Sequence, residues 1–354
     1  MSVRTAVTAL ALGSSAYAQS YTLSNPELAN FTIIDESFKE ILGANASIEL
    51  IYNATEPLFH EGPAYNVSGD TLYVSSNRIT LPAGQVDAST SNQTIKLSVV
   101  KGISSEDVSA ITVEQLSPSF NMPNGGAAHL GASGILWTAQ GTKNATSGIY
   151  SIPDPVNNPD QSFPVVTSFF GNQFNSPNDV TVNPADNGTI WFTDPNYGSS
   201  QGLRNAPQLP PQVYRYDPAS DSTRIAADGF EEPNGLAFNS AGDVLYVTDA
   251  SKSDTNPTGT ATIYAFDVIT SPGTFVTNKR VFAYAPSGIP DGIKVDSKGN
   301  VWSGTGVGVV VWNAAGQMLG EISISGGVSN FGFGADESTV FVLDEELLWR
   351  VTLA

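Results

Sequence analysis

One phrase recurs six times along this chain, and a repeat of this kind limits the fold more than any other feature of the sequence. Each copy begins with an amide or carboxylate residue and continues into a run rich in β-branched and aromatic residues, which is typical of a strand. The clearest copy is PNGLAFNSAGDVLYVTD at 233–249. The lead residues of the six copies are Glu61, Asn124, Asn178, Asn234, Asp291 and Asn330. We therefore expect six similar β units.

The spacing of the copies predicts how these units are arranged. Successive lead residues are 63, 54, 56, 57 and 39 residues apart, and propeller blades run about 40–50 residues before loop insertions. Two further strand-like runs follow in each copy. The sequence thus predicts an all-β fold, a six-bladed β-propeller. A pair of β-sandwiches would also have alternating strands, but it gives no reason for six copies of one phrase.

The chain stops after the third strand of the sixth copy, so that blade lacks an outer strand. The run IELIY at 48–52 precedes the first copy and has no place in it. We predict that this N-terminal strand joins the last blade and closes the ring, because closure removes exposed strand edges. The propeller, expected to be the catalytic domain, then spans residues 46–354. Residues 19–45 show no strong β pattern and are interpreted as an N-terminal extension with a short helix near 35–42.

The N-terminus has the pattern of a secretory signal peptide, covering residues 1–18. Arg4 provides the positive start, residues 6–12 form a short apolar run, and Ala-Tyr-Ala at 16–18 suits cleavage. No later apolar stretch is long enough for a membrane anchor. We expect a secreted, extracellular glycoprotein without a membrane partner. Its candidate N-glycan acceptors, all in Asn-x-Ser/Thr sequons, are Asn30, Asn45, Asn53, Asn66, Asn92, Asn144 and Asn187.

Composition excludes several function classes. The chain has 15 Lys and Arg against 34 Asp and Glu, a net charge of −19, whereas nucleic-acid binding needs a basic face. It has no Cys and only two His, which rules out thiol catalysis, Cys-based zinc sites and sites with several His ligands.

The lead residues suggest a metal site. First strands of propeller blades line a central channel and run the same way, so the six lead residues would form a ring of oxygen donors at one end. Ca²⁺ accepts 6–8 such ligands in irregular geometry; the sequence leaves Mn²⁺ and Mg²⁺ open. The alternative is structural: Pro-Asn-Gly and Pro-Asp-Gly are common turn sequences, and the six residues could cap the channel with hydrogen bonds only.

Several motifs add a resemblance to a known family. HEGPAY at 60–65, SPNDV at 176–180, WFTDPNYG at 191–198, PNGLAF at 233–238 and PDGIKVD at 290–296 resemble the gluconolactonase family, also called the senescence marker protein or regucalcin family. The resemblance covers about residues 48–354. It implies a six-bladed propeller that holds one divalent cation and hydrolyses lactones, with Glu61, Asn178, Asn234 and Asp291 as the metal ligands.

The predicted function is therefore an extracellular, metal-dependent lactone hydrolase that opens a sugar-type or pantoyl-type lactone to the hydroxy acid. In this hypothesis the metal polarises the carbonyl, water attacks, and Asp291 acts as the base, with Asn178 beside it at the metal. A non-catalytic calcium- or ligand-binding propeller and a promiscuous aryl esterase are the alternatives.

Four further residues are predicted to line the substrate pocket. Asn124 follows from its lead position, and His129 from the channel strand of the second copy, where a core role is the alternative. Ser176 occupies the position of an Arg in animal members of the family, and Tyr197 lies in the loop 196–212 over the site. Strand alternation would point His60 away from the channel, so packing or a contact behind the metal ligands is expected.

Overall fold

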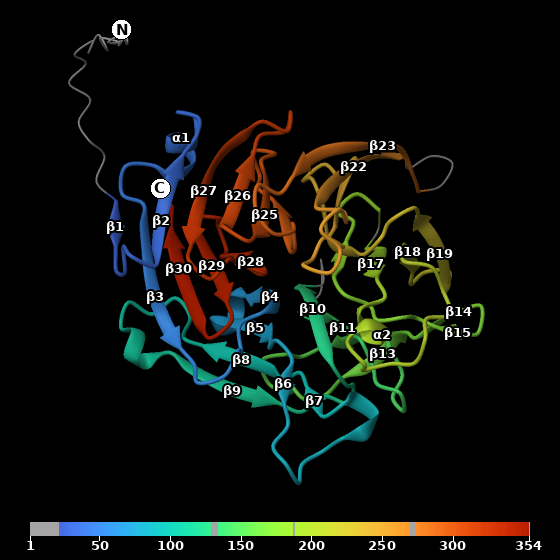
Figure 1. Cartoon of the computed structure of the whole chain (residues 1–354). Coiled ribbons are helices and arrows are strands. Elements are labelled where there is room, and N and C mark those ends of the chain that lie inside the picture. The colour runs from blue at the N-terminus through green and yellow to red at the C-terminus, as the bar shows by residue number, and fades with distance from the viewer. Residues whose placement is uncertain (1–20, 129–133, 187, 270–273, 354) are drawn as a thin grey trace, which may run out of the picture.

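The computed structural model describes residues 21–353 apart from 129–133, 187 and 270–273. Six sheets of four or five strands follow one another around a ring, so that the colour in Figure 1 runs round the molecule from blue to red. The predicted all-β, six-bladed propeller is confirmed. The signal peptide, His129 and Asn187 lie outside the described residues, and predictions for them stay predictions. No helix among the described residues is long and apolar enough to cross a membrane.

Blades 1 to 3 are antiparallel four-stranded sheets whose first strand is innermost. Blade 1 consists of β4 (Glu61–Asn66), β5 (Thr71–Ser75), β8 (Leu97–Lys101) and β9 (Thr112–Leu116). Blade 2 consists of β10 (Pro123–Ala128), β11 (Ile135–Ala139), β12 (Gly148–Ile152) and β13 (Phe163–Val166). Blade 3 consists of β16 (Val180–Val182), β17 (Ile190–Asp194), β18 (Gln212–Asp217) and β19 (Ser222–Ala227).

Blades 4 to 6 repeat this order from the innermost strand outward. Blade 4 consists of β20 (Pro233–Phe238), β21 (Val244–Asp249), β22 (Thr262–Ile269) and β23 (Phe275–Tyr284). Blade 5 consists of β24 (Ile293–Val295), β25 (Val301–Thr305), β26 (Gly308–Trp312), β27 (Met318–Ile324) and β2 (Ala29–Ile33). Blade 6 consists of β28 (Asn330–Phe333), β29 (Thr339–Asp344), β30 (Leu347–Thr352), β3 (Ser47–Asn53) and β1 (Thr22–Leu23).

Short elements decorate this ring. Two hairpins lie outside the blades, one inserted in blade 1 and one between blades 2 and 3. The elements are β6 (Ile79–Thr80) with β7 (Gln93–Thr94), β14 (Ser168–Phe169) with β15 (Asn172–Gln173), helices α1 (Phe38–Leu42) and α2 (Tyr197–Ser200), and 3₁₀ turns at Val67–Gly69, Ala88–Thr90 and Val108–Ala110. Helix α1 confirms the short helix expected near 35–42.

The N-terminal strand closes the ring as predicted. Strand β3 runs antiparallel to β30, with Ile48 opposite Val351 and Leu50 opposite Trp349 (Figure 1). The segment before it differs from our expectation, because residues 19–45 contribute strands as well. Strand β2 pairs with β27 at the edge of blade 5, and β1 pairs with β3. The chain start therefore joins two neighbouring blades, which the short and interrupted β pattern of this segment did not indicate.

The hydrophobic core lies between blades rather than at the centre of the ring. Tyr73 of blade 1 packs in one cluster with Trp137 of blade 2, and Trp191 of blade 3 packs in another with Val247 of blade 4. Sheet faces thus stack around the ring, and the channel is left to polar residues. Each blade needs both neighbours to bury its faces, because a single sheet has two apolar sides.

Ile48→Ala tests ring closure. The Ile48 side chain is 1% exposed within the cluster that joins blades 5 and 6, so its truncation should lower the free energy of unfolding by about 2–5 kcal/mol. Urea denaturation measures the loss. Ile34→Ala is the matched control, since Ile34 is 54% exposed and should change stability by under about 0.5 kcal/mol. Equal effects of the two variants would contradict a structural role for β3.

Candidate functional site

The six innermost strands meet around the channel and bring the lead residues to one end of it. Each of β4, β10, β16, β20, β24 and β28 contacts the next, and β28 returns to β4. The side chains of Glu61, Asn124, Asn178 and Asn234 are at least nine-tenths buried, and that of Asn330 is fully buried. Asp291 keeps partial access to solvent. The predicted ring of oxygen-bearing side chains is therefore present.

Hydroxyl groups hold this ring in place. In four consecutive blades, a Ser or Thr of the second strand donates a hydrogen bond to the backbone carbonyl of the next blade's lead residue. The pairs are Ser75 with Asn124 at 2.7 Å, Thr138 with Asn178 at 2.8 Å, Thr193 with Asn234 at 2.5 Å and Thr248 with Asp291 at 2.9 Å. Each lead residue thus has its backbone fixed by the preceding blade, while its side chain remains free for another partner.

The glycines that follow three lead residues serve this close approach. Gly125, Gly235 and Gly292 do not have positive φ angles, so the turn alternative does not explain them. A β-carbon on Gly235 would lie 2.5 Å from the Asp291 carbonyl oxygen, nearer than real contacts allow. Gly125 and Gly292 lie equally tightly against the next blade's lead residue. Pro-Asn-Gly is here a packing motif between blades.

Four lead residues carry buried oxygens without hydrogen-bond partners among the described residues: Asn124 Oδ1, Asn178 Oδ1, Asn234 Oδ1 and Asp291 Oδ1. Most buried polar atoms in proteins are paired, so four orphans at one repeat position need an explanation. Carbonyl and carboxylate oxygens are ligands that Ca²⁺ prefers, so a cation at this end of the channel would be a suitable partner for such oxygens. No three Asp, Glu or His side chains of the described chain gather closely enough to hold a metal alone. The amide oxygens are therefore essential to such a site.

Asn330 differs from the other lead residues. Its Nδ2 donates to Glu61 Oε2 at 2.6 Å, and its Oδ1 accepts from the backbone N–H of Phe331 at 2.8 Å. With both ends of its amide engaged, Asn330 orients Glu61 and offers no free oxygen to a cation.

The carboxylates of the site are buried and repel one another, and both effects raise their pKa values. Burial, followed by repulsion from Asp291, raises the pKa of Glu61 well above its usual value. Burial also raises the pKa of Asp291 to about 7, although polar contacts with Glu61 and Asn234 act in the opposite direction. Asp179, which we did not predict, adds a third carboxyl that is 3% exposed. A divalent cation would relieve this repulsion, so the donor set fits one.

Tyr197 lies beside the lead residue Asn234, and its place in a substrate pocket stays a prediction. Its hydroxyl accepts a hydrogen bond from Asn234 Nδ2 at 3.3 Å. Burial and the nearby Asp291 raise its pKa well above its usual value, so the hydroxyl stays protonated at neutral pH and can donate. Contacts from the blade 1 hairpin hold the loop behind it, where Ser91 Oγ donates to the Gly202 carbonyl at 2.9 Å.

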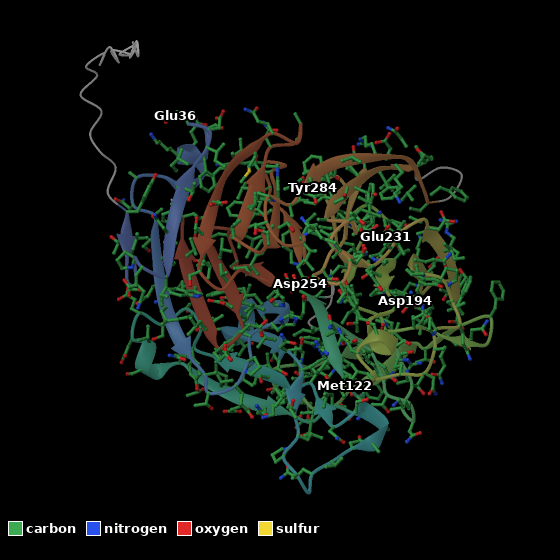
Figure 2. All side chains as sticks on the ribbon, viewed as in Figure 1. Glu36, Met122, Asp194, Glu231, Asp254 and Tyr284 are labelled. Carbon is green, nitrogen blue, oxygen red and sulfur yellow. The ribbon has the colours of Figure 1, made fainter. Side chains whose placement is uncertain are left out.

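Ser176 was predicted to line the substrate pocket, but in the structure its role is structural. It is completely buried, and its hydroxyl donates to the Pro195 carbonyl at 2.7 Å and accepts from the Gly198 N–H at 2.9 Å. Its own N–H donates to Asp194 at 2.8 Å (Asp194 is labelled in Figure 2). Through these hydrogen bonds Ser176 fixes the backbone at the start of α2, and thereby the position of Tyr197.

His60 is a site residue that strand alternation missed. It lines a cavity of about 220 Å³ together with Asp291, Thr305, Ser329 and Glu345. His60 precedes the first residue of β4, so the alternation of that strand does not extend to it. A larger cavity of about 350 Å³ beside Arg204 contains none of the lead residues.

Glu345 fixes the orientation of this histidine. His60 Nδ1 lies 2.8 Å from Glu345 Oε1, which leaves Nε2 without a hydrogen-bond partner among the described residues. Burial opposes the charged imidazole, but the Glu345 carboxylate outweighs it and raises the pKa of His60. Glu345 lies in the turn between β29 and β30, far from His60 in sequence, so no local signal could have joined them.

Comparisons with known proteins agree with this architecture. The model of the SMP-30/Gluconolactonase/LRE-like region matches residues 108–344, and the chain belongs to this family. A lactonohydrolase of Aspergillus oryzae is 27% identical over 93% of this chain and 76% of its own length. A gluconolactonase of Zymomonas mobilis is 27% identical over 95% and 90%.

Solved structures show the same fold. A gluconolactonase from Xanthomonas campestris superposes with a TM-score of 0.71 at 29% identity, covering 92% of this chain and 94% of its own. A calcium-binding protein from Agrobacterium tumefaciens, regucalcin, gives 0.58 at 16% identity over 86% and 94%; at that identity it supports the fold alone.

Gly235→Ala tests the packing role of the glycine between blades 4 and 5. Because the added methyl group would meet the Asp291 carbonyl at 2.5 Å, the variant should be destabilised by about 1–3 kcal/mol and should displace Asp291. Thermal unfolding and calcium titration measure the two effects. Gly69→Ala is the control, since its nearest neighbours are side-chain ends. A Gly235→Ala protein that matched Gly69→Ala in both measurements would refute this role.

The raised pKa values of Glu61 and Asp291 predict an unusual pH dependence without metal. A carboxyl with a raised pKa binds more protons when folded, so the stability of EDTA-treated protein should fall as pH rises from about 4 through about 7. Added Ca²⁺ should stabilise the protein more at pH 8 than at pH 5, because at pH 5 it competes with protons. Thermal unfolding at both pH values checks this. In Asp291→Asn the pH effect should shrink; an unchanged profile would contradict the assignment.

Proposed function

We propose that this protein is an extracellular, divalent-cation-dependent lactone hydrolase that opens sugar-type or pantoyl-type lactones. Family membership and similarity to two lactone-hydrolysing enzymes over nearly the whole chain support the hydrolase activity. The observation that carries the cation requirement is the set of buried, unpartnered oxygens of Asn178, Asn234 and Asp291 at the channel mouth. Asn178 Oδ1, Asn234 Oδ1 and Asp291, with Glu61 beside them, would hold one ion, and Ca²⁺ suits these donors.

The residues around the cavity can perform the hydrolysis. When bound, a divalent cation supplies Lewis-acid stabilisation of the negative charge that develops on the lactone carbonyl oxygen. Asp291 faces the cavity and takes a proton from the attacking water; it returns that proton to the ring oxygen as the ester C–O bond breaks, so a hydroxy acid leaves. The Tyr197 hydroxyl, which accepts a hydrogen bond from Asn234 Nδ2, would donate its own hydrogen to the substrate. His60, held by Glu345, lines the same cavity as Asp291 and would contact the lactone there.

Secretion and N-glycosylation belong to the same proposal. Six of the seven sequons lie within the described residues. Five of the six place their Asn at exposed positions, as N-glycosylation requires: Asn30, Asn45, Asn53, Asn92 and Asn144. Asn66 is only half-exposed, and its side-chain oxygen caps the turn at Val67–Gly69 by accepting from the Gly69 N–H.

Asp291→Ala should abolish lactone hydrolysis, by about 100-fold or more, while circular dichroism and thermal unfolding show a folded protein. Asp228→Ala controls for loss of an acidic side chain, because Asp228 is exposed and does not line the cavity. The assay is a panel of aldonolactones, pantoyl lactone and aryl esters, each with Ca²⁺ and with EDTA. Full activity after rigorous metal removal would overturn the cation requirement. No hydrolysis of any ester by the calcium-loaded wild-type protein would favour a binding propeller.

A further inference from the structure

His60 and Glu345 line the cavity of Asp291 and carry two hydrogen-bond acceptors without partners. Glu345 Oε1 accepts from His60 Nδ1 at 2.8 Å and from Asn77 Nδ2 at 3.0 Å. Because an ionised carboxylate only accepts, Nδ1 carries the ring hydrogen, and Nε2 has a lone pair when the imidazole is neutral. Nε2 has no partner within the described chain, and Glu345 Oε2 is buried and has none either. Such a pair suits a ligand that donates hydrogen bonds.

The backbone of His60 is fixed from two blades and connected to the neighbour of the proposed base. Its N–H donates to the Ser75 carbonyl at 3.0 Å, and its carbonyl accepts from Ser329 Oγ at 2.6 Å. The Ser329 carbonyl in turn accepts from the N–H of Gly292 at 2.8 Å. Ser329 therefore links His60 to the residue that follows Asp291, and His60 and Asp291 line one cavity of about 220 Å³.

Glu345, which holds the imidazole, has an uncommon backbone conformation. It lies in the short turn between β29 and β30 with a φ of 54°, in the left-handed region that favours glycine. Its carbonyl accepts from the Phe59 N–H at 2.8 Å, so the turn is anchored directly before His60. Glycine would adopt this turn with less strain, and the Glu345 side chain therefore has to supply something that glycine lacks. The hydrogen bond to His60 is such a contribution.

The hydroxyl groups of the cavity already have partners within the protein. Thr305 Oγ1 donates to the Gly308 carbonyl at 3.0 Å, and Ser329 Oγ donates to the His60 carbonyl. The other polar side chains of this wall are carboxyl groups and the His60 ring, which accept hydrogen bonds when ionised and neutral, respectively. A ligand with hydroxyl groups can satisfy these acceptors, whereas an unsubstituted alkyl or aryl group would leave them unpaired at a cost in binding.

The cavity also has room for a substituted ring. On this face, the second and third strands of blades 5 and 6 are joined by residues 306–307 and 345–346 alone, a shorter connection than in any of blades 1 to 4. Few side chains fill the space, because four lining positions are glycines: Gly288, Gly306, Gly326 and Gly327. A lactone can therefore lie against Asp291 with its ring substituents beside His60.

We propose that His60 is a specificity-determining residue that binds a ring hydroxyl of the lactone through Nε2, and that Glu345 is the positioning residue that aims it. The contact does not depend on the charge of the ring, since a hydroxyl group donates to neutral imidazole and accepts from imidazolium. The inference rests on the proposed lactone hydrolase function. It adds which group of the substrate this wall selects, and it favours hydroxylated lactones over unsubstituted lactones and aryl esters.

The test compares three lactones that differ in one hydroxyl group. The values of kcat/KM for α-hydroxy-γ-butyrolactone and β-hydroxy-γ-butyrolactone are each divided by that for γ-butyrolactone, with Ca²⁺ at pH 8 in a pH-stat. In His60→Phe, which keeps an aromatic ring without nitrogen, at least one ratio should fall about tenfold. In Glu345→Gly the same ratio should fall about threefold or more, although glycine suits the backbone of this turn.

Glu337→Gly is the matched control, because Glu337 is another glutamate of blade 6 with a positive φ, 61°, and does not line this cavity. It should keep the wild-type ratios. Unchanged ratios in His60→Phe would overturn the proposal, and a fall in His60→Phe alone would overturn the positioning role of Glu345. If the wild-type protein hydrolyses none of the three lactones, the proposed function fails. Calorimetric binding of the same lactones to wild-type and His60→Phe protein then still decides whether His60 recognises the hydroxyl group.

Discussion

The hydrogen bond from a second-strand hydroxyl to the next blade's lead carbonyl is the interaction on which the site depends. This hydrogen bond has two effects: it holds neighbouring blades together, and it fixes the backbone from which each polar side chain points into the channel. Thr248 shows both effects: its Oγ1 accepts the Gly235 N–H within its own blade at 2.7 Å and donates to the Asp291 carbonyl of the next blade at 2.9 Å. A buried hydroxyl satisfied on both sides rigidifies its surroundings. The glycines beside the lead residues allow the backbones to come this close.

Rigid backbones explain why unpaired oxygens survive at the channel mouth. A flexible side chain would turn toward any available donor, and the site would collapse onto itself. Here the backbone carbonyls of Asn178 and Asn234 are held by hydroxyl groups of the neighbouring blades, and the two side-chain oxygens have no hydrogen-bond partner among the described residues. The repulsion between Glu61 and Asp291 persists for the same reason. Such stored strain is typical of functional sites, where preorganised groups await a ligand.

The sequence predicted the fold well because its signal is repeated. Six copies of one phrase indicated the blade count, and the unfinished sixth copy indicated that residues 48–52 close the ring. The weaker signal in residues 22–33 was missed, since β1 and β2 are short and are strands only because β3 and β27 offer edges to pair with. Among the site residues, the lead positions were predictable. His60 was not, because it lies just before β4, outside the strand whose alternation the prediction used. Ser176 was placed in the wrong role, because a hydroxyl fits a substrate pocket and a buried loop support equally well.

By itself, the sequence determined the blade repeat, the oxygen chemistry of the lead residues and their common place at one end of the channel, because these follow from what each copy shares. Only the tertiary structure decided how the copies differ. In the structure, Asn330 forms hydrogen bonds with Glu61 and Lys294. The oxygens of Asn124, Asn178, Asn234 and Asp291 have no partners among the described residues. His60 contacts Glu345 where the first and last blades meet. These contacts connect residues from different blades, hundreds of positions apart in some pairs. Their distances depend on how the sheets stack, and no local pattern encodes that.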